Sequence, residues 1–184
     1  MVAAGSSEFP QTLWFSQAAA DFENMSPDSP DASSGDWDGT VEDDDAMSWT
    51  IAADDVNTIL WVASHRRLII GTNGGEWVAS SSGAVIIPTD ISVRRDSKFG
   101  VAAIPPILVG SRLLFIQRAG RKLTELGFSF EDDAYRGADM TRLATHIAFG
   151  GITQMAYAQE PNKLIYAVRN DGQLLSMTYI RDED

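Results

Sequence analysis

The sequence contains no cysteine, only two histidines and no long apolar run. The missing cysteines exclude a disulfide framework, a thiol nucleophile and any cysteine-based metal site. No apolar stretch approaches the roughly 18 residues that a membrane-spanning helix needs. The first residues carry neither a basic region nor an apolar core, so no signal peptide is predicted. We therefore expect a globular chain that folds in the cytosol and does not insert into a membrane.

Basic residues are missing from the N-terminal third of the chain. Residues 1–64 contain 13 Asp and Glu and no Lys or Arg, whereas residues 65–184 contain 13 acids and all 14 bases. The overall net charge of −12 is therefore a property of residues 1–64. Tight non-specific binding to nucleic acid needs clustered Lys and Arg. The only candidate cluster is Arg94-Arg95-Asp96-Ser97-Lys98, for which a solvated strand end is the favoured alternative.

Two regions are predicted from composition and alternation. The first, residues 1–55, is an acidic segment with two short strands at 11–16 and 47–52 around a polar loop at 26–46. The second, residues 56–184, contains three units, each made of strand, link, strand, glycine turn and strand. The turn glycines of these units are Gly75, Gly120 and Gly172, which are 45 and 52 residues apart. This spacing is close to that of propeller blades, so we predict an all-β fold of antiparallel, propeller-like blades.

One short α-helix is predicted near residues 139–149. Met140, Leu143 and Ile147 recur at helical spacing, Asp139 is a suitable N-cap and Gly150 a suitable stop. The helix would pack on or between the blades.

The stretch Gly71-Thr72-Asn73-Gly74-Gly75 allows two interpretations. A phosphate-binding loop would need a Gly-Lys-Ser/Thr end or a Gly-x-Gly-x-x-Gly pattern that opens a helix. Glu76-Trp77-Val78 follows instead, which is an acid and then a strand. The stretch therefore predicts a hairpin turn, and the positive φ that such turns require explains its glycines.

Three sets of residues are candidate chemical sites, and each has a plainer alternative. Partial agreement with a calcium-loop template comes from Ser34, Asp36, Asp38, Gly39, Glu42 and Asp45. A solvated acidic loop is favoured because the first and last template positions carry the wrong residues.

His65 and His146 could serve a hydrolase, but no Gly-x-Ser-x-Gly elbow accompanies them. The acidic runs 43–45 and 131–133 could supply a glycosidase pair, but nothing indicates an apolar pocket around them. We therefore predict no catalytic, cofactor-binding or metal-binding residue.

All five tryptophans lie within the first 77 residues. Trp61 and Trp77 are predicted core residues, because they lie in predicted strands. Trp37 lies in the polar loop, where it either contacts another chain or folds back onto its own domain.

Several ordered motifs resemble one family along nearly the whole chain. They are "PQTLWFSQAAADFENM", "DDDAMSWTIAADDVNTILW", "LIIGTNGGEWVAS", "ISVRRDSKFG", "LLFIQRAGRKLTELGFSFEDDAYRGADMTRLATHI" and "GGITQMAYAQEPNKLIYAVRNDGQLLSMTY". Together they are similar to the tubular or nozzle-type tail proteins of short-tailed bacteriophages and related prophage virion proteins.

The resemblance implies a non-enzymatic structural protein of the virion tail, assembled in the host cytoplasm. It also implies a homo-oligomeric ring that contacts other tail or head–tail connector proteins and lines a channel for viral DNA. Members of this family are much longer, so the chain is expected to be a fragment or a shortened version. The alternative function is a propeller-like binding module that recognises a host-surface glycan or a protein partner.

Overall fold

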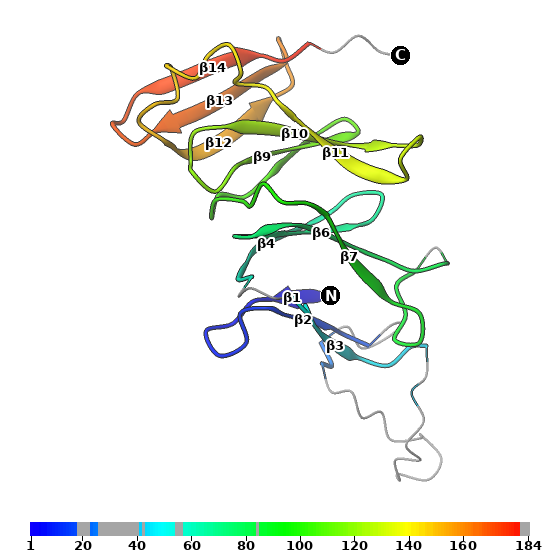
Figure 1. Cartoon of the computed structure of the whole chain (residues 1–184). Coiled ribbons are helices and arrows are strands. Elements are labelled where there is room, and N and C mark those ends of the chain that lie inside the picture. Colours follow the sequence, from blue (N-terminus) through cyan, green and yellow to red (C-terminus); the bar gives the residue numbers. More distant parts are fainter. Residues whose placement is uncertain (18–22, 26–40, 42, 54–56, 84, 181–184) are drawn as a thin grey trace.

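The computed structural model describes residues 1–17, 23–25, 41, 43–53, 57–83 and 85–180 (Figure 1). These residues form four small antiparallel sheets and no helix. The predicted all-β class is confirmed. Nothing in the described part of the chain is a helix that could span a membrane.

The strands follow one another in chain order within each sheet. The first sheet contains β1 (Val2–Ala4), β2 (Thr12–Phe15) and β3 (Met47–Thr50). The second contains β4 (Ile59–Ser64), β5 (Leu68–Thr72), β6 (Gly75–Ser80) and β7 (Ser92–Ser97). The third contains β8 (Ile107–Val109), β9 (Arg112–Ile116), β10 (Leu123–Ser129) and β11 (Ala134–Asp139). The fourth contains β12 (Ile152–Ala158), β13 (Leu164–Arg169) and β14 (Leu174–Thr178).

The four sheets stack face to face in chain order (Figure 1). Strand β9 explains the stacking, because successive side chains of a strand point to opposite faces. Leu114 and Ile116 pack in the core shared with the fourth sheet, whereas Leu113 and Phe115 pack in the core shared with the second sheet. The third sheet is therefore buried on both faces, and each large side chain contributes roughly 1.5–3 kcal/mol through its burial.

Strands that hold the same position within their own sheets lie side by side in neighbouring sheets. The first strands touch in two places, β1 with β4 and β8 with β12, and the fourth strands β7 and β11 also touch. The stack is open, since the described residues form no closed ring of sheets. The first and fourth sheets are thus the two ends of the stack. Trp61 and Trp77 are each 8% exposed, which confirms them as core residues.

The predicted hairpin at residues 71–75 is confirmed, but its glycines serve a different purpose. Gly74 and Gly75 do not adopt a positive φ. A Cβ atom at Gly74 would lie 2.0 Å from Asn57 Oδ1, and one at Gly75 would lie 2.5 Å from the carbonyl oxygen of Ser97. Close packing therefore requires these glycines. At Gly172 the expected positive φ is present, at 83°.

The helix predicted near residues 139–149 is wrong. Asp139 ends strand β11, and residues 140–150 form successive tight turns in which Ala144 N–H donates to Thr141 O and Ile147 N–H donates to Ala144 O. The Asp139 carboxylate caps the first of these turns, at 2.9 Å from the backbone nitrogen of Thr141. The helical spacing was not sufficient here, because Leu143, the central residue of the expected apolar face, is 94% exposed and so buries almost none of its surface.

Candidate functional site

The two histidines do not form a shared site. His65 lies in the β4–β5 turn, where its Nδ1 is 3.1 Å from the hydroxyl of buried Tyr135. His146 is exposed in the turns that follow β11. No described contact joins them, so a hydrolase that uses both gains no geometric support.

The acidic run at residues 131–133 is paired with arginines. Asp132 accepts hydrogen bonds from Arg136 and Ser129, and these lower the pKa of its carboxyl group. Asp133 forms an ion pair with Arg67 at 3.3 Å. A glycosidase acid needs a raised pKa, which is the opposite of the shift found for Asp132.

The stretch that partly matches a calcium-loop template lies almost wholly outside the described residues. Its positions Ser34, Asp36, Asp38, Gly39 and Glu42 fall there, as does Trp37. Asp45 is described, and nearby Asp43 accepts a hydrogen bond of 2.5 Å from Thr89. No group of three or more potential metal ligands occurs within the described ranges.

The cluster at residues 94–98 forms strand β7 and its end, and its arginines make contacts within the chain. Arg94 pairs with Asp96 at 3.1 Å, and the guanidinium of Arg95 lies 5.5 Å from the ring centroid of Trp77. Asp96 also accepts a hydrogen bond from Tyr135 N–H at 2.9 Å, which ties β7 to β11. Asp96, together with Arg94, which donates to the backbone oxygen of Asp133, thus joins neighbouring sheets.

A buried carboxylate escaped the sequence analysis. Glu76 at the start of β6 is fully buried, and its Oε2 atom accepts a hydrogen bond from Ser97. Burial raises the pKa of Glu76, while bonds from Ser97 and from the backbone of Phe99 and Gly100 oppose that rise. These partners lie on the segment that leads from the second sheet to the third. The carboxylate therefore anchors that connection.

The most distinctive surface cluster is an aromatic–arginine corner, defined as Arg66, Arg67, Phe128 and Phe130. The guanidinium of Arg66 lies 5.2 Å from the Phe128 centroid and 5.0 Å from the Phe130 centroid. Arg67 lies 5.3 Å from the Phe128 centroid. The two phenylalanine rings meet edge to face at 5.1 Å, and Phe130 is 75% exposed. The corner thus presents an aromatic ring beside a cation to solvent.

Two turns build this corner. The β4–β5 turn supplies the arginines, and the β10–β11 turn supplies Phe130 next to the acidic run at 131–133. Arginines of these turns have acidic partners, since Arg67 pairs with Asp133 and Arg136 with Asp132. Because these cations are paired with carboxylates, the corner lacks the positive excess that phosphate backbones require.

The sequence offered only a weak signal for the corner. An Arg-Arg pair in one turn and "FSF" before an acidic run in another can be read, but their meeting depends on how the sheets stack. A scan against protein-family models and a search of curated proteins found no match to this chain.

Proposed function

We propose that the chain is a non-enzymatic structural subunit of a bacteriophage tail, a wall element of a tube or nozzle through which DNA passes. In this proposal the four sheets are propeller-like blades, and identical subunits associate into a ring that joins other tail or connector proteins. Assembly would take place in the host cytoplasm, with the virion as the final location and without membrane insertion.

The open stack of sheets is the observation that carries this proposal. First strands contact first strands and fourth strands contact fourth strands in neighbouring sheets, which is the arrangement of propeller blades around an axis. The stack has two ends, and side chains that point away from the core cover the outer face of the fourth sheet. Leu174 on this face is 66% exposed, and Val168 and Tyr166 accompany it on β13. An apolar sheet face of this kind is typical of a surface that another subunit covers.

Charge gives further support. The acid-only segment of residues 1–64 contains a short run at 43–45, in which Asp43 and Asp44 are exposed. Negative charge on a channel wall would repel passing DNA and limit its adhesion. The hydrogen bond of His65 and the ion pairs of Asp132 and Asp133 join strands and turns within the chain.

The mass of the particle in solution tests the proposal. Light scattering over a hundredfold range of protein concentration should show assemblies of several chains, and negative-stain electron microscopy should show rings with a central channel. A monomer that persists at the highest concentration would contradict the proposal.

A second function, recognition of a glycan or a protein partner, is favoured by the aromatic–arginine corner. The exposed ring of Phe130 offers an apolar face, and the guanidinium of Arg66 and the carboxylate of Glu131 lie nearby as hydrogen-bonding groups. Glycan-array binding by the intact chain should then be lost in Phe130→Ala. The matched control is Phe149→Ala, since Phe149 is another exposed phenylalanine, 67% accessible, away from the corner. Equal binding by both variants would rule out the corner.

A further inference from the structure

An apolar cavity lies under the inner face of the fourth sheet. It has a volume of about 130 Å³ and lies between strands β12–β14 and the turns at residues 141–148. Its lining includes Ala144, Ile147, Met155, Ile165, Leu175 and Met177. The cavity is partly open to solvent and has almost no polar surface. Apolar cavities of around 150 Å³ stay dry and accept a benzene-sized group, so this one suits a single aromatic ring.

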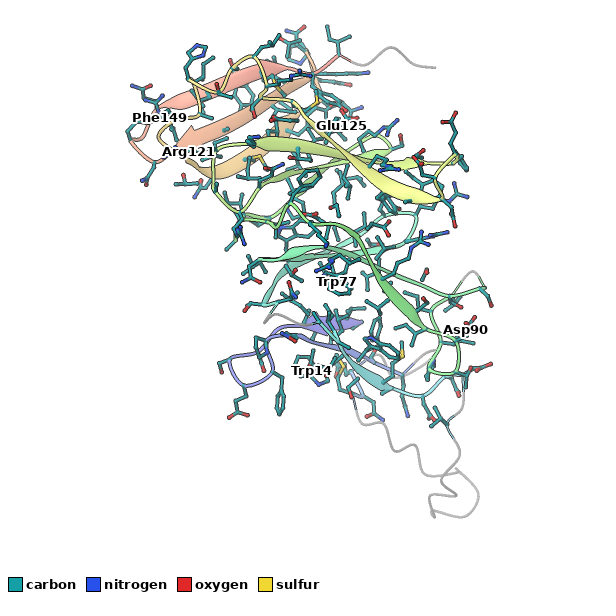
Figure 2. All side chains as sticks on the ribbon, in the orientation of Figure 1. Trp14, Trp77, Asp90, Arg121, Glu125 and Phe149 are labelled. Carbon is teal, nitrogen blue, oxygen red and sulfur yellow. The ribbon has the colours of Figure 1, made fainter. Side chains whose placement is uncertain are left out.

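Exposed apolar side chains lie on the turns that line the cavity. Leu143 is 94% exposed, Phe149 67% and the lining residue Ile147 43%. Single exposed apolar residues are common, but a group of them around an apolar cavity marks an interaction site. Figure 2 places Phe149 beside Arg121 at this end of the stack.

The charged groups around the cavity favour an acidic partner. Arg142 is exposed between the lining residues Thr141 and Ala144, and the guanidinium of Arg121 lies 4.7 Å from the centroid of Phe149. Neither arginine forms an ion pair with any described residue. Two further cations, Lys122 and Arg169, pair with Asp139 and Asp171 respectively. Four cations and two anions leave a positive excess of two charges.

The same chain carries a group that fits this cavity. Phe9 is 57% exposed in the β1–β2 loop and directly follows exposed Glu8. This loop belongs to the acid-only region and to the first sheet, at the opposite end of the stack from the cavity (Figure 1). The two surfaces therefore lie at opposite ends of one copy, and they can pair head to tail between copies.

We propose that the cavity binds the β1–β2 loop of a second copy of this chain, with the ring of Phe9 inside the cavity and Glu8 beside Arg142. This inference rests on the self-assembly proposed above and names its interface. A head-to-tail contact closes into a ring when the rotation between copies permits it.

Sedimentation velocity on the full chain tests the contact through the dissociation constant of assembly. Phe9→Ala, Ala144→Leu, which fills the cavity, and Arg142→Glu should each weaken association at least tenfold. The matched controls are Leu108→Ala, which shortens an exposed apolar side chain of β8, and Lys98→Glu, which makes the same charge change at an exposed residue just after β7. Both controls should associate like the wild type. The double variant Glu8→Lys/Arg142→Glu should recover to within threefold of the wild type.

The outcomes separate the two proposals. Wild-type assembly that withstands all three cavity and loop variants overturns the inference and leaves the structural role in place. A wild-type chain that remains monomeric overturns both. Thermal denaturation of each variant identifies any that lose their fold. Where a variant does not fold, NMR of the folded wild type with added benzene tests the cavity instead. If the methyl signals of Met155 and Met177 do not shift on addition of benzene, the cavity does not accept an aromatic ring and the inference is overturned.

Discussion

At the scale of single residues, Glu76 is an ionisable side chain in a buried position, where an apolar side chain would carry no desolvation cost. Its carboxylate is fully buried, and its Oε1 atom has no hydrogen-bond partner within the described chain. Ser97 and the backbone of Phe99 and Gly100 offset part of the desolvation cost. The hydrogen bonds of this side chain hold the connection between the second and third sheets in place, but burial of its charged form costs free energy.

This arrangement predicts how stability depends on pH. The pKa of Glu76 is raised in the folded state, so its contribution to stability is fully present below the unfolded-state pKa and is lost as pH rises through the folded-state pKa. Glu76→Gln keeps the shape and removes the ionisation. We expect it to be more stable than the wild type by roughly 1 kcal/mol at pH 8, and the difference should shrink towards pH 4.

Urea denaturation of both proteins between pH 4 and pH 8 measures this difference. Glu131→Gln is the control, because Glu131 is an exposed carboxylate and should leave the profile unchanged. A difference between Glu76→Gln and the wild type that stays constant with pH would show that ionisation of Glu76 has no part in stability.

At the scale of elements, the β5–β6 hairpin was predicted correctly for a reason that needed correction. The sequence pattern of alternating apolar residues around Asn-Gly-Gly is enough to locate a hairpin. It cannot say that a Cβ atom on Gly75 would meet the carbonyl oxygen of Ser97, because that contact joins two strands whose register is set by tertiary packing.

The close approach predicts that Gly75→Ala destabilises the protein by about 2 kcal/mol, the typical cost of overpacking against a backbone atom that cannot move away. Gly83→Ala is the matched control. Its nearest neighbour would be the Ser81 hydroxyl at 3.8 Å and its φ is not in the positive region, so the change should stay within about 0.5 kcal/mol. Thermal unfolding of the two variants compares them, and equal midpoints would refute the steric explanation.

The turns after β11 show where local patterns fail. Apolar residues at helical spacing predicted a helix, but a helix of this length gains most of its stability from packing its apolar face. Leu143 and Phe149 remain exposed, and the lining residues Ala144 and Ile147 face the cavity. The aromatic–arginine corner and the cavity were equally beyond sequence reasoning, since each exists only where elements distant in sequence meet.

At the scale of the whole molecule, burial differs between the middle and the ends of the stack. The second and third sheets are covered on both faces, because each contributes side chains to two of the three hydrophobic cores. Among the described residues, the first and fourth sheets each contribute to only one core. In a stack where each sheet contacts only its neighbours, stability is approximately a sum of sheet and interface contributions. The end sheets therefore lack one interface.

Hydrogen exchange should reveal this gradient. We expect backbone amides of β5, β6, β9 and β10 to exchange slowest, and those of β1–β3 and β12–β14 to exchange faster, because the end sheets can open without breaking the central cores. If subunits cover the end sheets, a rise in protein concentration should slow exchange at both ends and leave the centre unchanged. Exchange that is uniform along the chain, or independent of concentration at the ends, would contradict a stack completed by neighbouring subunits. Arg142→Glu supplies the control, since it should hold the end sheets at their dilute-solution rates even when concentrated.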